Sequence, residues 1–255
     1  MKRVAVIGGG ASGLAAAYFA AKKGCEVVLF ERQKKLGRKI LVTGNGRCNI
    51  SNLDQDVSHY HGGNTKFAHQ VLSRFGLEET RLFFMSLGIP FAEEKNGRLY
   101  PASFQSSAVP LILSYELKKR NVDIRLHRKI DSITPGKKGF TLTTAGKEKH
   151  DFDSVIVSAG SCAAPQIGGS DSGYELISSS GHTVHEPFPA ITPINIPLKI
   201  LHRLQGIKWD CSVKAVFSNR VLGSSTDELL FTGYGISGPA ALNISRFVKI
   251  GRAHV

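Results

Sequence analysis

Two short apolar runs near the N-terminus enclose a segment with helical character. Residues 2–7 are rich in Val, Ala and Ile with little alternation, which is typical of a strand buried on both faces. The segment "LAAAYFAAKKG" then has a helical pattern that ends at Gly24, a residue type that commonly terminates helices. A second buried-strand pattern, "EVVLF", follows at residues 26–30. This order predicts the beginning of a parallel βαβ unit.

Further along the chain, helical and strand patterns alternate. Helical periodicity is found in residues 64–76, 77–88 and 107–120. Strand patterns occupy residues 122–133 and 139–158, the second as a β meander that ends in a buried strand at residues 154–158. Asn96 and Gly97 predict a hairpin turn. Residues 33–63 are rich in Gly, Asn and Lys and predict an ordered loop region.

A change of composition at residues 185–197, "HEPFPAITPINIP", predicts a crossing between two domains. Beyond it, residues 210–217 and 228–235 have strand patterns. Ser237 then stands where the N-cap of a helix is expected.

Composition and charge narrow the class of protein. With 42% hydrophobic residues and no apolar run of about 18 residues, the chain is typical of a globular protein and not of a membrane-spanning one. Its four cysteines are far apart and no histidine lies close to them, which argues against a disulfide framework and a metal site and favours the cytoplasm. The net charge of +13 is spread along the chain, so a solvated basic surface is favoured over a nucleic-acid partner.

Gly8, Gly10 and Gly13 form a GxGxxG motif between the first predicted strand and its helix. The first glycine permits a tight turn, the second a close approach to a pyrophosphate, and the third close packing of helix on strand. The helix N-terminus offers N–H groups to phosphates. Glu31 ends the second strand, where a carboxylate binds ribose hydroxyls and disfavours a 2′-phosphate. The pattern predicts a dinucleotide site for FAD or NAD, with a purely structural glycine turn as the alternative.

Several strings in the chain resemble one family of bacterial enzymes. They are "VAVIGGGASGLAAA", "GRKILVTGNGRCN", "VSAGS", "FPAITPI" and "LLFTGYGISGPAAL". The family is that of the NAD(P)/FAD-dependent oxidoreductases also labelled aminoacetone-oxidase-family enzymes, and it includes a bile-acid dehydrosteroid reductase. The resemblance implies an α/β fold, with a glutathione-reductase-like Rossmann domain that binds FAD and an inserted β-rich domain.

The resemblance also implies a domain division. Residues 1–189 are expected to form the FAD-binding domain without its C-terminal segment, and residues 190–249 to begin the inserted domain. The last six residues, "IGRAHV", match the translation of a widely used sequencing adapter. We therefore expect residues 250–255 to be non-native and the chain to be a C-terminally truncated fragment.

The family's motifs assign cofactor contacts to individual residues. By resemblance, Ser12 and Gly13 meet the pyrophosphate, and Glu31 with Arg32 binds the adenosine ribose. Ile130 corresponds to the residue whose backbone contacts adenine. The remaining correspondences are Arg38 and Lys39 in the "GRK" string and Ala159 and Gly160 in a small turn, which here lacks the usual threonine.

Residues 41–52, "LVTGNGRCNISN", combine glycines with amide side chains. Gly44 and Gly46 permit a positive φ and a close approach to a flat ligand. Asn45 and Asn49 offer amide donors and acceptors suited to the polar edge of an isoalloxazine ring. From these residues alone, a plain Asn-Gly hairpin turn and a ligand-binding loop remain equal alternatives. The resemblance favours a loop that faces the flavin.

Two further residues of this loop carry reactive or charged groups. Arg47 is expected to pair with the pyrophosphate or to favour anionic reduced flavin. Cys48 is placed among the cofactor-binding residues as a buried structural thiol and not as a redox partner, because no second cysteine is close in sequence.

These features predict an FAD-dependent oxidoreductase whose flavin is reduced by NAD(P)H and passes hydride to an unidentified small molecule, such as one with an electron-poor C=C bond. The sequence contains no second GxGxxG motif, so NAD(P)H would dock transiently, or oxygen would be the oxidant of an amine-type oxidase. A flavin-dependent RNA-modifying enzyme or a non-catalytic flavoprotein would also account for the same motifs. The sequence indicates no catalytic residue, no metal ligands and no oligomeric state.

Overall fold

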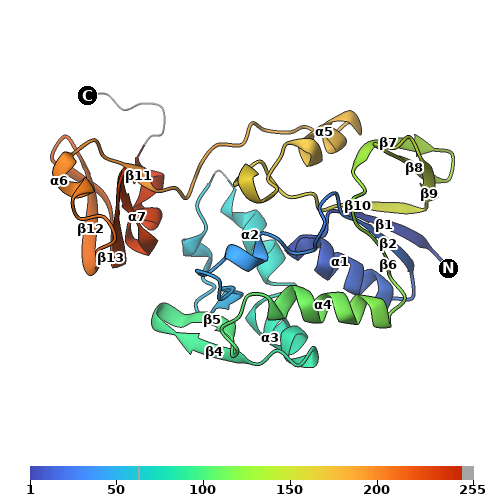
Figure 1. Ribbon diagram of the computed structural model, residues 1–255, viewed down its shortest axis with the longest axis horizontal. Helices are drawn as coiled ribbons and strands as arrows, with labels where there is room; N and C mark the ends of the chain where they lie inside the picture. The colour runs from blue at the N-terminus through green and yellow to red at the C-terminus, as the bar shows by residue number, and fades with distance from the viewer. Residues whose placement is uncertain (63, 249–255) are drawn as a thin grey trace. The chain divides into compact units, whose positions relative to one another are not determined.

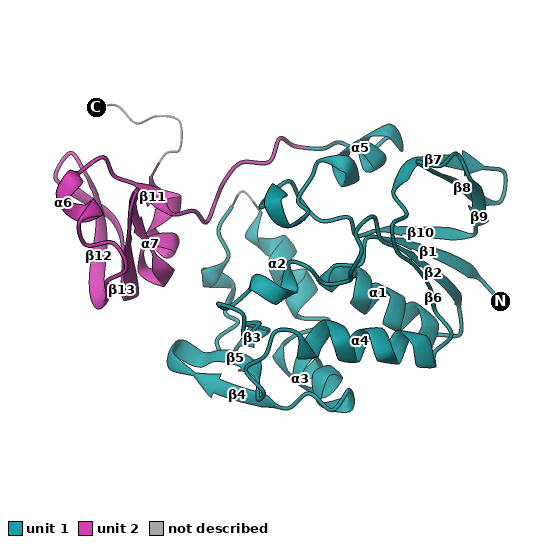
Figure 2. Cartoon of the chain, viewed as in Figure 1, with its two compact units in different colours: residues 1–184 teal, residues 185–255 magenta. Residues whose placement is uncertain are grey.

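The computed structural model describes residues 1–62 and 64–248 (Figure 1). The chain forms two compact units, residues 1–184 and the residues from His185 onward (Figure 2). This division comes at the start of the proline-rich segment, earlier than the domain boundary predicted after residue 189. The expected non-native residues 250–255 lie outside the described residues.

A four-stranded parallel sheet forms the centre of the first unit. Its strand order is β10 (Ser154–Val157), β1 (Arg3–Ile7), β2 (Glu26–Phe30) and β6 (Asp123–Arg125). Helix α1 (Ala11–Lys22) connects β1 to β2 and is followed by Gly24 at φ +80°. The predicted βαβ unit and the α/β Rossmann-like fold class are therefore confirmed.

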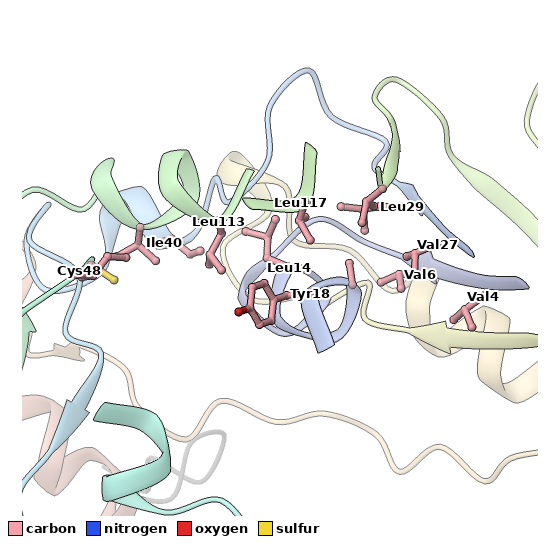
Figure 3. Close-up of a cluster of buried hydrophobic side chains, with 14 residues drawn as sticks. Val4, Val6, Leu14, Tyr18, Val27, Leu29, Ile40, Cys48, Leu113 and Leu117 are labelled. Atoms are coloured by element: carbon pink, nitrogen blue, oxygen red, sulfur yellow. The ribbon is translucent and has the colours of Figure 1, made fainter. Parts of the chain in front are cut away.

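Successive residues of the central strands point into two different cores. Val6 and Leu29 are fully buried and pack on the side of α1 and α4 (Ala108–Lys119), where Leu14, Leu113 and Leu117 meet them (Figure 3). Their neighbours on each strand pack on the opposite side of the sheet. Because both faces of the sheet are covered, the strands are continuous apolar runs instead of alternating ones.

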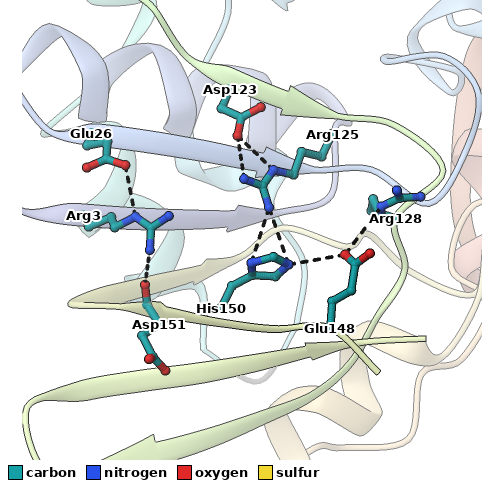
Figure 4. Close-up of polar contacts among 8 residues, drawn as sticks. All are labelled: Arg3, Glu26, Asp123, Arg125, Arg128, Glu148, His150 and Asp151. Carbon is teal, nitrogen blue, oxygen red and sulfur yellow. Dashed lines mark hydrogen bonds and ion pairs between the residues drawn. The ribbon is translucent and has the colours of Figure 1, made fainter. Parts of the chain in front are cut away.

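The second face of the sheet is covered by an antiparallel meander and a short helix. These elements are β7 (Ile130–Gly136), β8 (Gly139–Thr144), β9 (Lys149–Phe152) and α5 (Ser172–Ser179). Phe152 and Leu176 pack in the same cluster as Phe30. At the N-terminal end of β1, Arg3 Nε pairs with Glu26 at 3.0 Å and Arg3 Nη1 donates to the Asp151 carbonyl at 2.8 Å, which ties β1 to β9 (Figure 4).

Three details of this region differ from the sequence predictions. Residues 122–133 are not one strand: the chain turns at His127, where φ is +55°, and β6 and β7 belong to different sheets. The strand predicted as buried at residues 154–158 is half-buried, because β10 lies at the edge of the described parallel sheet and leaves Ile156 36% exposed. Helix α5 is not predicted, because its sequence SGYELISS is short and polar.

A smaller sheet and two helices complete the first unit. The sheet has the order β3 (Ser51–Asn52), β5 (Arg98–Pro101) and β4 (Phe91–Glu94), and the helices are α2 (Thr65–Leu72) and α3 (Leu77–Ser86). The predicted hairpin turn is confirmed by Asn96, which has φ +63°. The three predicted helices are also confirmed, with shorter bounds. Short 3₁₀ helices occur in this unit at Ile40–Val42, Val57–His59, Lys95–Gly97 and Pro165–Ile167, and in the second unit at Ser245–Phe247.

The second unit is an antiparallel sheet with its own core. The strand order is β11 (Ile194–Asn195), β14 (Gly235–Ser237), β13 (Arg220–Thr232) and β12 (Lys208–Phe217), with helices α6 (Lys199–His202) and α7 (Gly238–Ile244). Phe231, Ile236 and Ala241 lie in this core. Ser237 is the N-cap residue of α7, as predicted, but its side chain makes no capping hydrogen bond. In the described part of the chain, no helix is long and apolar enough to cross a membrane.

Candidate functional site

The glycine-rich turn after β1 is shaped by close backbone contacts. Gly8 has φ +104°, and a Cβ on it would lie 2.4 Å from the carbonyl oxygen of Ser158. A Cβ on Gly13 would lie 1.8 Å from the carbonyl oxygen of Gly8. Any side chain at these two positions would therefore push α1 and β10 away from the turn.

Gly10 differs from the other two glycines because its surroundings are open. It is the N-cap residue of α1, with φ −80° and ψ −169°, and no side chain caps the helix. A Cβ on Gly10 would meet no atom within 4 Å. The helix N-terminus therefore presents uncapped backbone N–H groups beside empty space, which suits the oxygens of a phosphate.

Glu31, the residue after β2, is bonded to the same turn. Its Oε2 accepts a hydrogen bond from the N–H of Gly9 and its Oε1 accepts one from the N–H of Gln33, each at 2.7 Å. These two bonds fix the carboxylate beside the glycine-rich turn. Each carboxylate oxygen keeps a further lone pair for a ribose hydroxyl.

One cavity of about 510 Å³ joins most of the predicted site residues. The predicted residues that line it are Gly8, Gly10, Ser12, Glu31, Arg38, Lys39, Cys48, Asn49, Ala159 and Gly160. A smaller pocket adjoins the cavity and shares Gly8, Glu31 and Ala159 with it. The predicted residues Arg32 and Ile130 line this smaller pocket, together with Arg128. Arg32 and Ile130 therefore lie beside the glycine-rich turn, around a pocket of only about 30 Å³, and their contact with adenosine stays a prediction.

Two cations project from the segment after β2 toward the cavity. Arg38 Nη1 donates to the side-chain oxygen of Gln33 at 2.8 Å, and Lys39 Nζ donates to the carbonyl of Ser161 at 3.2 Å. Both side chains line the cavity. They add positive charge next to the N-terminus of α1, where the helix dipole also favours an anion.

The loop of residues 43–49 reaches the cavity only at its two ends. Its backbone is left-handed at Gly44, Asn45, Gly46 and Cys48, with φ between +56° and +79°. The positive φ expected of both glycines is therefore confirmed. Within this loop, Thr43, Cys48 and Asn49 line the cavity, whereas Asn45, Gly46 and Arg47 do not. Gly13, a predicted site residue in α1, does not line the cavity either.

Arg47 is directed to a different partner from the one that its sequence position indicates. Its Nη1 pairs with Glu94 Oε1 at 2.6 Å, its Nε donates to the Gly44 carbonyl at 3.2 Å, and its guanidinium lies 4.5 Å from the centre of the Tyr100 ring. The expectation that Arg47 meets the pyrophosphate or the flavin does not agree with this geometry. The physical reason is that β4 brings a carboxylate, and β5 an aromatic ring, to this side of the loop.

Cys48 and Asn49 have distinct environments in the cavity wall. Cys48 is buried, and burial raises the pKa of its thiol, although a hydrogen bond with the Thr43 side chain lowers it in part. The Asn49 amide nitrogen donates to the carbonyls of Ser51 and Leu99, at 2.9 and 3.3 Å. Cys48 is thus held neutral at ordinary pH, and the Asn49 amide is fixed by backbone carbonyls on the wall of the cavity.

Several residues of the cavity wall are absent from the sequence predictions. They are Gln33, Lys35, Ile40, Thr43, Ile50, Thr80, Phe83, Phe84, Val109 and Leu113. Five of these ten, Ile40, Phe83, Phe84, Val109 and Leu113, are apolar residues of α3, α4 and the 3₁₀ helix at Ile40–Val42, and in the sequence they have the same periodicity as ordinary core residues. They add apolar side chains to a cavity wall that also contains the polar glycine-rich turn.

Among residues 1–62 and 64–248, no group of three metal-ligating side chains is placed to hold a metal ion. The open space at Gly10, the uncapped helix and the fixed Glu31 carboxylate all fit a dinucleotide with its pyrophosphate at α1. The first unit is therefore a dinucleotide-binding domain of the Rossmann type. Residues 2–240 match the model described as HI0933-like protein Rossmann domain, and the chain belongs to this family, within the FAD-dependent oxidoreductase superfamily. The family expected from the sequence is thereby confirmed.

Three curated relatives are similar to almost the whole chain. A 3-dehydro-bile acid delta(4,6)-reductase of Clostridium scindens is 38% identical over 98% of this chain and 61% of its own length. A ribosomal RNA dihydrouridine synthase of Escherichia coli is 32% identical over 96% of this chain and 61% of its own length. The protein of the same name from Haemophilus influenzae is also 32% identical, over 95% and 60% respectively. The chain thus spans about three fifths of the length of these relatives.

Proposed function

We propose that this protein is an FAD-dependent oxidoreductase that delivers hydride to a C=C bond conjugated with a carbonyl group. The observation that carries the proposal is one cavity whose wall contains both the open cradle at Gly10 and the apolar side chains of Phe83 and Phe84. FAD combines both characters, with a charged pyrophosphate in its middle and a flat aromatic ring system at one end. The family to which the chain belongs supports the choice of FAD over NAD.

The residues of the cavity have separate parts in this function. The backbone N–H groups at Ser12 bind the pyrophosphate, and the Glu31 carboxylate accepts hydrogen bonds from the ribose hydroxyls. Lys39 neutralises phosphate charge, while Phe83 and Phe84 exclude water from the ring end. Bound FAD supplies the capacity to accept and donate a hydride.

The acceptor class follows from the names of the relatives. A bile acid with a 3-keto group and a 4,6-diene contains a C=C bond conjugated with a carbonyl, and so does the uracil ring that is reduced in dihydrouridine. We take a small-molecule enone as the first candidate, because the bile-acid reductase has the higher identity. A reduced pyridine nucleotide is the proposed electron donor, and the four free cysteines support a cytoplasmic location.

A reduction and reoxidation experiment tests this function. The purified protein is reconstituted with FAD, and bleaching of the flavin is followed without oxygen after addition of NADH and NADPH separately. Reoxidation is then followed with a 3-keto-4-ene bile acid, with an RNA fragment that contains uridine, and with oxygen. Rapid reoxidation by the enone alone supports the proposal, whereas a protein that cannot be loaded with FAD contradicts it.

A flavin-dependent RNA-modifying enzyme is the second candidate. Two relatives carry the name ribosomal RNA dihydrouridine synthase, and the chain has a net charge of +13. This function requires reoxidation by the RNA fragment and binding that weakens steeply with salt, because each phosphate contact releases a counterion. Binding of RNA that does not change between low and physiological salt would argue against it.

A further inference from the structure

The segment between Gly160 and α5 is a closed loop, which we call the cavity loop (residues 161–170). The N–H of Ser170 donates to the carbonyl of Ser161 at 3.1 Å and closes its neck, and the N–H of Gly169 donates to the carbonyl of Ala164 at 3.1 Å within it. Ala164 (φ +55°) and Gly168 (φ +104°) have left-handed conformations that reverse the chain. The cavity loop therefore has the form of an Ω-loop, whose contacts are mostly its own.

The cavity loop forms part of the cavity wall but contributes little to the core. Ile167 and Gly168 line the cavity beside Gly160. In the part of the chain that the structure describes, none of the loop's apolar residues belongs to a buried hydrophobic cluster or packs on one. Segments with few buried apolar contacts are the ones that open locally while the rest of a protein stays folded.

Two cations attach the cavity loop to the segment after β2. Arg32 Nη2 donates to the carbonyl of Gly168 at 2.5 Å, and Lys39 Nζ donates to the carbonyl of Ser161 at 3.2 Å. Arg38 is close as well, because a Cβ on Gly168 would lie 3.7 Å from its Nη1. The bond from Lys39 reaches the neck of the loop at Ser161, and the bond from Arg32 reaches Gly168 within the loop. Together the two bonds hold the loop against the cavity.

The same two cations face the space where an anionic dinucleotide fits. Lys39 lines the cavity, and Arg32 lines the adjoining pocket beside Glu31. A phosphate oxygen is a stronger acceptor for a cationic donor than a peptide carbonyl is. An incoming pyrophosphate therefore competes with Ser161 and Gly168 for these donors.

We infer that the cavity loop is a lid latched by Arg32 and Lys39, and that release of this latch admits and releases the dinucleotide. The inference rests on the proposed FAD site and gives the two cations a function beyond binding the cofactor. In addition to any direct contact with the dinucleotide, they position the loop that covers it. Removing the bonds of Arg32 and Lys39 by mutation should therefore increase the rates at which the dinucleotide enters and leaves the cavity.

Hydrogen exchange of the protein without FAD tests the latch directly. In Arg32→Met and Lys39→Met, we expect exchange of the amides of residues 167–170 to rise at least about tenfold, since a hydrogen bond from a charged donor is lost. Arg32→Lys and Lys39→Arg keep a cationic donor and should restore much of the protection. Lys34→Met is the matched control, because Lys34 is exposed in the same segment and does not line the cavity. Unchanged exchange in both Met variants would overturn the latch.

The kinetics of FAD binding separate a lid from a simple cofactor ligand. Flavin fluorescence in a stopped-flow instrument gives the association and dissociation rate constants for each variant. A latched lid predicts that both constants rise in Arg32→Met, whereas loss of a mere cofactor contact raises dissociation alone, and that second result would contradict the lid. If the unmodified protein fails to bind FAD, the proposed function fails, but the exchange experiment still decides whether the latch exists.

Discussion

At the scale of single residues, two glycines of one motif, Gly8 and Gly10, lack a side chain for different physical reasons. Gly8 has φ +104°, and a Cβ on it would lie 2.4 Å from the Ser158 carbonyl oxygen, so the backbone itself requires glycine. Gly10 has φ −80°, which any residue adopts, and open space in place of a side chain. The fold makes no demand on Gly10, and the missing side chain there leaves room for a ligand.

Gly10→Ser tests this distinction. Serine is a favoured N-cap residue, so we expect the variant to melt at the same temperature as the unmodified protein or slightly higher. Its Cβ and hydroxyl occupy the proposed place of the pyrophosphate, so FAD affinity should fall at least about tenfold, or about 1.4 kcal/mol of binding free energy. Thermal denaturation and a fluorescence titration with FAD measure the two effects.

Gly8→Ala is the matched control for that experiment. Its positive φ and the 2.4 Å approach to Ser158 predict a loss of about 1–3 kcal/mol in folding stability. A Gly10→Ser protein that binds FAD normally would show that the open space at α1 is not where the pyrophosphate lies.

Cys48 provides a second prediction at this scale. Burial raises the pKa of its thiol above the ordinary value of 9.0, and the hydrogen bond with Thr43 only partly opposes this. We expect iodoacetamide at pH 7.5 to modify Cys48 more slowly than the half-buried Cys25, Cys162 and Cys211, as measured by peptide mass spectrometry. Preferential labelling of Cys48 at this pH would contradict the assignment of an inert thiol.

The raised pKa of Cys48 also has a consequence for stability. The folded protein holds this thiol proton more tightly than the unfolded chain does, so the contribution to stability is complete below pH 9.0 and is lost as pH rises above it. Denaturant titrations of the unmodified protein and of Cys48→Ala at pH 8 and pH 10 should therefore show a smaller difference at pH 10. If the two proteins differed in stability by the same amount at both pH values, the pKa of the Cys48 thiol would be the same in the folded and unfolded chain.

At the scale of elements, the loop of residues 43–49 is fixed by the β4–β5 hairpin. The ion pair from Arg47 to Glu94 and the stacking of Arg47 on Tyr100 join this loop to both strands. Gly44 also approaches the Tyr100 ring, which a Cβ would meet at 2.7 Å. The positions of Cys48 and Asn49 in the cavity wall therefore depend on strands that lie far along the chain.

A double-mutant cycle of Arg47→Ala and Glu94→Ala measures this connection. Both side chains are about one third exposed, so we expect a coupling of about 0.2–1 kcal/mol in the free energy of unfolding. FAD affinity should change little in either variant, because Arg47 does not line the cavity. Loss of FAD binding in Arg47→Lys, with stability unchanged, would instead assign the guanidinium a direct contact with the cofactor.

The elements around the glycine-rich turn could be predicted because their signals are local. In β1, α1 and β2, burial on both faces produces continuous apolar runs, and the glycine spacing identifies the turn between them. The partner of Arg47 could not be predicted, since Glu94 lies 47 residues away and reaches it only through the pairing of β4 with β5. The position of Phe83 and Phe84 in the cavity wall could not be predicted either, because a helix residue that lines a cavity and one that fills a core have the same periodicity.

At the scale of the whole molecule, the chain consists of two units with separate hydrophobic cores. The two clusters of the first unit draw their buried residues from positions 4 to 176, and the cluster of the second unit begins beyond residue 185. Every residue that lines the cavity belongs to the first unit (Figure 2). A ligand of the cavity should therefore stabilise one unit and leave the core of the other unchanged.

Differential scanning calorimetry with and without FAD tests this independence. We expect two transitions, because each unit buries its own core, and only the transition of residues 1–184 should respond to FAD. At a free FAD concentration of about one hundred times Kd, the stabilisation is about 2.7 kcal/mol, which corresponds to a rise of about 5–10 °C for a unit of this size. Gly10→Ser, with its affinity for FAD lowered at least about tenfold, should reduce the rise by about half or more at the same FAD concentration, without lowering either transition in the absence of FAD. A single transition that rises with FAD would show instead that the two units unfold together.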